Sequence, residues 1–293
     1  PAIRPSPPAR PMPSLPSVGQ DIRMPQVVEL SRYPVKGFTA EPRESLEVQA
    51  DGRIAGDRVL AFRFARAATP DTREGLDYWP KAKGLSLQDF PALAALQLSF
   101  DEERLRVSIT HNGAVLVEAG LDDAGRANLV DAVTDYVLAT PEGARLKGPG
   151  RLPLVLVGDG VTSRFQDRPR GYVSVHSQAS VAALEAAMKT EVDGRRFRSN
   201  VVIDGVEAWD ELEWEGELRF GDVRFLTEGP IVRCLATHAN PDTGVRDTPV
   251  LTGLKADVGQ AQPTLGRLLL PGDAGGTIRI GDEVRIGALA HHG

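Results

Sequence analysis

The sequence contains a single cysteine, Cys234, and that scarcity excludes several classes of site. An intramolecular disulfide, a cysteine-rich zinc module and a protein-bound iron–sulfur cluster each need several sulfur ligands from the chain. The GxxxxGK[ST], GxSxG and HExxH motifs are also missing, so phosphate-loop NTPases, hydrolases with a nucleophile elbow and zincin proteases lose their usual support. Any redox chemistry must therefore use a group other than a cluster held by the chain's own thiols.

Long apolar runs and a strong excess of either charge are absent as well. The chain has 40 acidic and 34 basic residues, a net charge of -6, so nothing global favours nucleic acid as a partner. It has no run of about 18 apolar residues, and its first residues lack the apolar core of a secretory signal. We therefore expect a soluble cytoplasmic protein with no membrane partner. A local cluster of arginines can still hold a phosphate, because the mean charge says little about one pocket.

The distribution of prolines and apolar residues divides the chain into three parts. Residues 1–25 contain eight of the 22 prolines and almost no bulky apolar side chains, which predicts a disordered tail because such a segment cannot offset its ordering entropy. Residues 26–120 contain six short alternating runs separated by turn signals, which favours an antiparallel β-barrel as an N-terminal domain. Residues 121–289 are expected to form a second β-rich domain.

The second domain also contains two helical patterns. Apolar side chains recur at helical spacing in residues 122–140 and again in residues 180–190, where Ser180 is the expected N-cap. Residues 276–287 are expected to form a hairpin with its turn at Gly281. The sequence therefore predicts a mainly β fold with a few helices, in the α+β class.

Cys234 lies in residues 231–237, an alternating run that predicts a strand, and a turn signal at 240–244 ends this strand soon afterwards. Three roles stay open for such a thiol: a packed core residue, a nucleophile, or a metal ligand whose remaining ligands come from a cofactor. A nucleophile needs a base, and the candidates are His111, His176 and His238. On a strand, His238 would lie about 13 Å from Cys234, which is too far for direct proton transfer.

Arg195, Arg196 and Arg198 lie immediately before a predicted strand and have two possible roles. They form either a solvated strand edge or an anion pocket, since guanidinium groups bind phosphate in a bidentate manner. Asn200 would add an amide donor and acceptor to such a pocket. Further cations, at strand ends of the first domain, are Lys36 and Arg58.

Taken together, these segments resemble the MOSC family, the molybdenum cofactor sulfurase C-terminal family, in the two-part form with an N-terminal β-barrel domain found in amidoxime-reducing components. The resemblance runs from about residue 26 to residue 288. It depends on "RYPVKG", "AGDR", "SVHSQASVAAL", "RRFRSNVVIDG", "WDELEWEGELRFGDVRF", "PIVRCLATHANPDTG" and "GTIRIGDEV". The number of these segments, and their order along the chain, argue against a chance match.

The resemblance implies a pterin-dithiolene molybdenum cofactor whose metal takes one protein ligand, Cys234. It also implies that the pterin and its phosphate are held by Lys36, Gly37, Arg58, Arg198, Asn200 and Arg233. Three positions depart from the family's motifs. Gly37 and Val232 stand where relatives carry serine, and Ser199 stands where proline is usual.

The activity implied by the resemblance is the reduction of N-hydroxylated compounds by a molybdenum-dependent oxidoreductase. Electrons would come from a separate flavin or iron–sulfur protein, because the chain has neither the cysteines for a cluster nor a flavin-binding pattern. The alternative is a cofactor carrier or sulfur-transfer module in which Cys234 bears a persulfide. A cofactor-free hydrolase with a cysteine–histidine pair is a third hypothesis.

Overall fold

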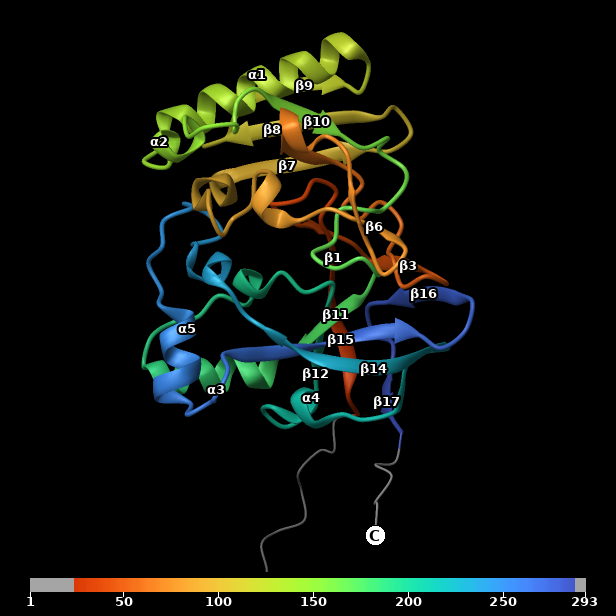
Figure 1. The fold of residues 1–293 in the computed structure, drawn as a ribbon. Coiled ribbons are helices and arrows are strands. Elements are labelled where there is room, and N and C mark those ends of the chain that lie inside the picture. Colours follow the sequence, from red (N-terminus) through yellow and green to blue (C-terminus); the bar gives the residue numbers. More distant parts are fainter. Residues whose placement is uncertain (1–23, 288–293) are drawn as a thin grey trace, which may run out of the picture.

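The computed structural model describes residues 24–287, and the lower body in Figure 1 is built on one eight-stranded sheet. Its strands are, in chain order, β1 Gln26–Arg32, β2 Glu41–Pro42, β11 Val173–Ser177, β12 Val201–Asp204, β13 Glu217–Phe220, β14 Val223–Val232, β15 Thr264–Pro271 and β17 Val284–Ile286. Across the sheet they follow the order β17-β13-β14-β15-β11-β12-β1-β2. Adjacent strands are antiparallel except for β11 and β12, which are parallel.

The large sheet curls until strands near its two ends meet. Gln26 of β1 forms a bridge with Glu283, the residue before β17, and the Val284 amide donates to the Pro25 carbonyl at 2.7 Å. Curling turns alternate side chains of each strand inward, where they exclude water. Large members of this core are Leu30, Trp214, Phe220, Phe225, Leu269 and Ile278. The lower body is therefore barrel-like.

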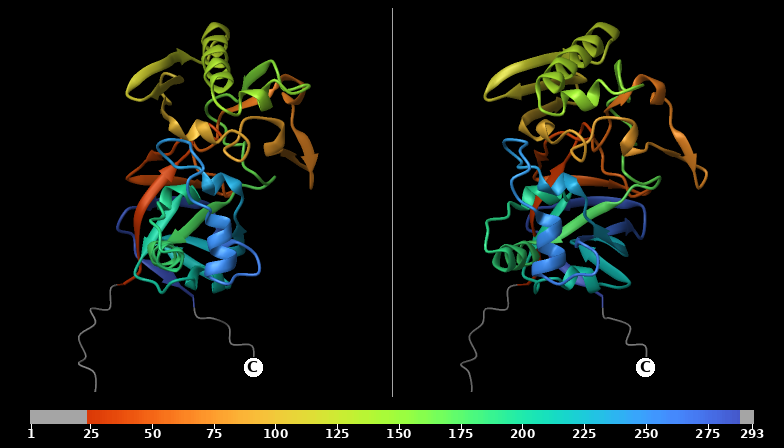
Figure 2. Two further views of the ribbon diagram at one scale, coloured as in Figure 1. Left: turned by 90° about the vertical axis from the view of Figure 1, so that its left-hand side faces the viewer. Right: turned by 60° about the vertical axis from the view of Figure 1, so that its left-hand side comes forward.

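The upper body packs helix α1 Asp123–Ala139 over a three-stranded sheet. The strands of this sheet are β7 Leu96–Asp101, β8 Arg106–His111 and β9 Ala114–Gly120. Asp122 caps the helix, because its carboxylate accepts a hydrogen bond from the Gly125 amide at 2.7 Å. The helix buries Leu129, Val133 and Val137. Both views in Figure 2 place α1 at the end of the molecule remote from the large sheet.

Shorter elements connect the two bodies. Three two-stranded sheets pair β3 Ser45–Gln49 with β16 Gly275–Arg279, β4 Ala61–Phe64 with β10 Leu154–Val157, and β5 Asp71–Arg73 with β6 Leu76–Tyr78. The other α-helices are α2 Gly143–Leu146, α3 Gln178–Met188, α4 Asp210–Glu213 and α5 Val250–Thr252. Short turns of 3-10 helix are η1 Ala65–Ala67, η2 Lys81–Lys83, η3 Pro91–Ala95, η4 Gly194–Phe197 and η5 Leu235–His238, and η6 Gly253–Asp257 is a π-helical turn.

The predicted mainly β fold with a few helices is confirmed. The six alternating runs correspond to β1, β3, β4, β7, β8 and β9, and the two helical patterns correspond to α1 and α3. Strand β1 joins the large sheet while α1 packs in the upper body, so contacts link the parts on either side of residue 120. The domain limits at 26–120 and 121–289 stay a prediction. The predicted tail, 1–25, lies almost wholly outside the described residues.

Two local predictions are wrong. Helix α3 begins after Ser177, whose hydroxyl accepts the Ser180 amide at 3.1 Å, because the chain passes directly from β11 into the helix. Ser180 is instead buried and donates its hydroxyl to Glu211 at 2.8 Å. The expected hairpin at Gly281 does not form, since β16 pairs with β3 and β17 pairs with β13. Gly281, with φ +88°, makes a corner at which the chain changes sheets.

No helix within residues 24–287 is long and apolar enough to cross a membrane. The expected cytoplasmic location stays a prediction.

Candidate functional site

One cavity of about 340 Å³ is lined by all seven residues that the sequence places in a site. They reach it from four separate segments: the loop after β1, the loop before β4, the link between η4 and β12, and the link between β14 and η5. These residues are Lys36, Gly37, Arg58, Arg198, Asn200, Arg233 and Cys234. The fold thus gathers cations and a thiol from distant parts of the chain, while their roles toward a cofactor stay predictions.

Cys234 lies at the start of a helical turn and not inside a strand. Strand β14 ends at Val232, and Cys234 has extended backbone angles (φ -128°, ψ 176°) where it caps η5. Its carbonyl accepts hydrogen bonds from the amide and the hydroxyl of Thr237, both at 3.0 Å. These bonds turn the chain, so the strand predicted over residues 231–237 is wrong beyond Val232. The half-buried, free cysteine lines the cavity.

None of the three histidines considered as a base lines this cavity with Cys234. The Nε2 atom of His238 accepts a hydrogen bond from the Leu251 amide at 3.1 Å, so its lone pair is occupied. His176 is 2% exposed and lines a different cavity, and His111 lies on β8 in the upper body. The arrangement lacks the nucleophile–base contact that a cysteine–histidine hydrolase requires.

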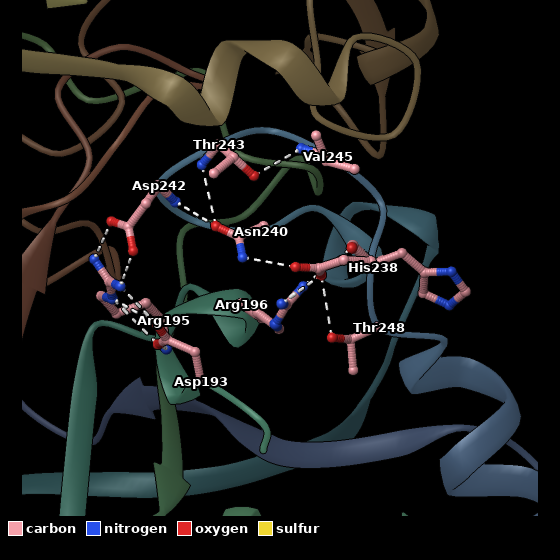
Figure 3. A network of polar contacts seen from close by, with 10 residues as sticks. Asp193, Arg195, Arg196, His238, Asn240, Asp242, Thr243, Val245 and Thr248 are labelled. Carbon is pink, nitrogen blue, oxygen red and sulfur yellow. Dashed lines mark hydrogen bonds and ion pairs between the residues drawn. The ribbon is translucent and has the colours of Figure 1, made fainter. Parts of the chain in front are cut away.

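The loop after Cys234 is fastened to η4 by Arg196, as Figure 3 shows. The guanidinium donates to the His238 carbonyl at 3.0 Å and pairs with the Asp247 carboxylate at 2.6 Å. Asp247 also accepts a hydrogen bond from the Asn240 amide at 2.7 Å. Arg196 is 6% exposed and its charge is compensated. It therefore acts as a buried tie for the loop, although it also borders the cavity.

Arg195, the neighbouring arginine, is compensated at the surface. It pairs with Asp193 at 2.6 Å and with Asp242 at 2.8 Å, and Figure 3 shows it between these two carboxylates. Hydrogen bonds to Asp242 and Asp193 raise the pKa of Arg195. Of the three arginines in the predicted run, only Arg198 is left without a carboxylate partner within residues 24–287.

Tyr33 joins the arginines of the cavity, although it was not among the predicted site residues. The guanidinium carbon of Arg198 lies 4.3 Å from the centre of its ring, and that of Arg58 lies 5.0 Å away. The phenol donates to the Ser199 carbonyl at 3.2 Å. Burial raises the pKa of Tyr33, and the two arginines act against this rise. Tyr33 lies directly before the proline of the "RYPVKG" segment, which was part of the resemblance. The sequence did not show that its ring contacts two arginines.

Lys36 is buried and paired within the protein. Its Nζ atom donates to the Asp167 carboxylate at 2.6 Å and to the Phe165 carbonyl at 3.0 Å. Burial lowers the pKa of Lys36, and Asp167 opposes this change. Desolvation would raise the pKa of Asp167, but the Lys36 ammonium lowers it to about 2. The side chain of Asp167 is 61% exposed, and nothing in the sequence patterns singled it out.

Asn200 positions the cavity wall through contacts inside the protein. Its amide nitrogen donates to the Ser31 carbonyl at 3.2 Å and to Asp57 at 3.5 Å, and its oxygen accepts from the Ser174 hydroxyl at 2.8 Å. The buried Asp57 also pairs with Arg58. Burial would lower the pKa of Arg58, but Asp57 raises it. Asn200 thus links β1, β11 and the loop of Asp57, and has no amide group to spare for a ligand.

Arg198 and Arg233 meet only neutral oxygens and aromatic rings within residues 24–287. Arg198 donates to the Phe38 carbonyl at 2.6 Å, and Arg233 donates to the carbonyls of Leu265 at 2.7 Å and Phe197 at 2.8 Å. Burial lowers the pKa of both arginines, that of Arg233 to about 10. Carbonyl oxygens leave the positive charge uncompensated, so an anion that enters the cavity meets two unpaired guanidinium groups.

The wall of the cavity also contains buried polar atoms without partners. The Ser86 hydroxyl and the side-chain oxygen of Gln166 make no hydrogen bond, and both residues line the cavity. Gly37 adopts φ +86°, and a Cβ there would lie 3.2 Å from the Leu85 carbonyl oxygen. Glycine therefore suits this position better than a residue with a side chain. A polar anionic ligand would match both the unpaired charges and the unpaired hydrogen-bonding atoms.

A metal at this site would depend on ligands from outside the chain. Residues 24–287 contain no group of three or more His, Cys, Asp or Glu side chains placed to hold a metal ion. One thiolate alone does not hold a transition metal. The donor set of the cavity therefore suits a metal that arrives within a larger, anionic cofactor.

Comparisons with known proteins find one family and several relatives that match part of the chain. Residues 162–285 match the MOSC domain family. The chain is 36% identical over 119 residues to human mitochondrial amidoxime-reducing component 1, over 37% of this chain and 34% of that protein. It is 45% identical over 78 residues to the molybdenum cofactor sulfurase of Drosophila grimshawi, over 26% of this chain and 10% of that protein. The chain thus spans about a third of the length of the first relative.

A crystal structure of the YUAD protein from Bacillus subtilis is also similar, with a TM-score of 0.43 and 12% identity over 89% of this chain and 94% of that one. The segment that matches the domain family contains Arg198, Asn200, Arg233 and Cys234, whereas Lys36 and its neighbours precede it. The resemblance inferred from the motifs is confirmed over residues 162–285, the segment that matches the MOSC domain family.

Proposed function

We propose that the cavity around Cys234 binds a molybdenum cofactor, and that the chain is an oxidoreductase that reduces N-hydroxylated compounds. The observation that carries the proposal is a free, half-buried thiol in one cavity with two guanidinium groups that lack carboxylate partners within residues 24–287. The names of two similar proteins, an amidoxime-reducing component and a molybdenum cofactor sulfurase, support the same cofactor. The first name also supports the reductase activity.

The residues of the cavity fit such a cofactor. A pterin with a phosphate is anionic and rich in hydrogen-bonding groups, and Lys36, Arg58 and Arg198 supply positive charge from both halves of the chain. Ser86 and Gln166 supply unpaired hydrogen-bonding atoms. Cys234 would be the one ligand that the protein gives to the metal.

When bound, the cofactor would supply the two-electron chemistry that converts an N–OH group and two protons into N–H and water. The chain's own contribution is to bind and orient the reactants. Val232 and Leu235 are exposed on either side of Cys234, where they offer an apolar contact to the body of a substrate. Electrons would come from a separate flavin or iron–sulfur protein, because one cysteine cannot hold a cluster.

Metal analysis and spectroscopy of Cys234 variants test this proposal. Protein produced with molybdate should contain molybdenum and pterin near one per chain, and Cys234→Ala should change the metal's absorption spectrum because a sulfur ligand is lost. Cys234→Ser, which replaces sulfur by oxygen, should give a third spectrum. An unchanged spectrum in both variants would show that Cys234 does not bind the metal. Absence of molybdenum and pterin from the wild-type protein would remove the proposal altogether.

A carrier or sulfur-transfer role is the second candidate, and the 45% identity to a molybdenum cofactor sulfurase favours it. In this role Cys234 would carry a sulfur atom as a persulfide. Mass spectrometry of the intact protein separates the two functions. A persulfide adds one sulfur atom to the chain and is removed by a thiol reductant, whereas a thiolate that binds the metal has its ordinary mass after the cofactor is lost.

A further inference from the structure

A second cavity, of about 780 Å³, shares Arg198 with the Cys234 site. Its wall comes from residues 28–44 around β1 and β2, from 87–98 of the upper body, and from α3 and the loop after η5. Lys36, Arg58 and Cys234 do not line it. The residues common to both walls are Leu87, Arg196, Arg198 and Ala236. It is therefore a neighbouring space and not an extension of the cofactor cavity.

Most of the second cavity's wall is apolar. The main contributors are Leu30, Leu87, Leu98, Val181, Val202 and Ile280. Its volume falls in the range of about 300–1,000 Å³ that is typical of small-molecule sites. Apolar walls of this extent favour a ligand with an apolar body, because contact removes carbon surface from water.

Two deeply buried polar side chains of this wall lack partners. Ser199 is 4% exposed and its hydroxyl makes no hydrogen bond, and His176 is 2% exposed with an unpartnered Nδ1 atom. A buried polar atom without a partner carries a free-energy cost that a ligand can remove. The cavity therefore combines an apolar wall with a few unsatisfied polar groups, which is the composition of a binding site.

The charges around the second cavity lie at different depths, and the exposed ones include the basic residues Arg43 and Arg195. Glu29, Glu44 and Glu185 line it but are exposed, and solvent and salt screen exposed charges. Arg198 is half-buried, uses one guanidinium nitrogen for the Phe38 carbonyl, and has no carboxylate partner within residues 24–287. Because a desolvated charge acts more strongly than a screened one, Arg198 decides which ligand charge is favoured.

We propose that the second cavity binds a small carboxylic acid with an apolar body. Arg198 and the Ser199 hydroxyl hold the carboxylate, and the side chains of Leu98 and Val181 contact the body. This site is additional to the proposed cofactor site, with which it shares Arg198.

Titration calorimetry with 4-phenylbutyrate, compared with the neutral 4-phenylbutyramide, tests the ligand chemistry. The carboxylate should bind at least about tenfold more tightly than the amide, since charge-assisted hydrogen bonds are about twice as strong as neutral ones. Arg198→Met should remove this preference. No binding of 4-phenylbutyrate, or equal binding of the two compounds, would overturn the proposal.

A matched pair of tryptophan variants tests the location. Ala182 lines only the second cavity and Val232 lines only the Cys234 cavity, and both side chains are exposed, so each tolerates a larger residue. Ala182→Trp should weaken binding of 4-phenylbutyrate by about tenfold or more, whereas Val232→Trp should leave it unchanged. The opposite pattern would place the ligand in the cofactor cavity and overturn the assignment. Equal melting temperatures of the two variants establish that both are folded.

Discussion

Arg195, Arg196, Arg198 and Arg233 form two pairs with different surroundings. Arg195 and Arg196 meet carboxylates and fasten the loop that follows Cys234. Arg198 and Arg233 meet only backbone carbonyls and aromatic rings, and both line the cavity of Cys234. A compensated guanidinium stabilises its surroundings, whereas an uncompensated one at a cavity is ready for an external anion. The interaction partner of each arginine, rather than its position in the sequence, therefore shows whether it has a structural role or belongs to the binding site.

Removing an uncompensated guanidinium group should have the largest effect of the changes considered. The effect should be on the affinity for an anion and not on the stability of the fold. Arg198→Met should lower the affinity of cofactor-free protein for inorganic pyrophosphate by about tenfold to a hundredfold, because a hydrogen bond to a charged group contributes about 1.5–3 kcal/mol. Titration calorimetry measures this affinity. The free energy of unfolding should change little, since the charge that is removed has no counter-ion within residues 24–287.

Arg195→Met is the matched control for that variant, because it makes the same change three residues away at a compensated arginine. It should leave the affinity for pyrophosphate unchanged. If both variants weaken binding equally, the loss reflects the total charge of the protein, and the distinction between the two pairs is wrong.

Replacing Arg196, which is buried and compensated, should instead lower the stability of the fold. Arg196→Met leaves the Asp247 carboxylate without its guanidinium and the His238 carbonyl without a donor. We expect the free energy of unfolding to fall by about 1–3 kcal/mol, less than for a fully buried pair because the side chain of Asp247 is 39% exposed. Urea unfolding measures the change. A loss below about 0.5 kcal/mol, the range of ordinary surface substitutions, would show that the loop does not depend on this tie.

Lys36 is intermediate between the compensated and the uncompensated arginines, since it has a carboxylate partner but this partner, Asp167, is largely exposed. The pKa of Asp167 is lowered from 3.8 to about 2 in the folded protein, so the pair stabilises the fold above the unfolded value and loses this contribution as pH falls toward 2. The difference in unfolding free energy between wild type and Asp167→Asn should be constant from about pH 7 to about pH 5 and shrink below about pH 4.

Urea unfolding at a series of pH values measures this difference. Asp193→Asn, which removes a carboxylate that does not line either cavity, provides the comparison. A difference that grows as the pH falls would mean that folding raises the pKa of Asp167, which contradicts the ion pair.

The sequence was sufficient for the members of the site that carry a distinctive chemical group. Cys234 is the single thiol, and Lys36, Arg58 and Arg198 lie in short motifs next to turn signals, so their residue types and positions were readable. Tyr33 and Asp167 were missed because their roles arise from tertiary contacts. Nothing local shows that the Tyr33 ring meets two guanidinium groups, or that the Asp167 loop returns to Lys36.

The fold shows the same limit. Alternation predicted the strands, because inward and outward side chains differ in a curled sheet. It did not predict their partners, and β16 and β17 pair with distant strands although a glycine turn separates them. The strand expected through Cys234 ends at Val232 because the bonds from Thr237 to the Cys234 carbonyl compete with continued pairing. Pairing partners and competing hydrogen bonds depend on the whole chain, and period-two patterns do not contain them.

The smallest effect is expected at the surface pair, and it sharpens the comparison between compensated arginines. Asp242→Asn removes one of two carboxylates that contact Arg195, and the side chain of Asp242 is 65% exposed. The free energy of unfolding should fall by less than about 1 kcal/mol, and the difference from wild type should shrink in high salt because exposed charges are screened. Urea unfolding at low and high ionic strength measures it. The contrary result is a loss of unfolding free energy as large as that of Arg196→Met and unchanged by salt. It would show that an exposed arginine stabilises this loop as much as a buried one.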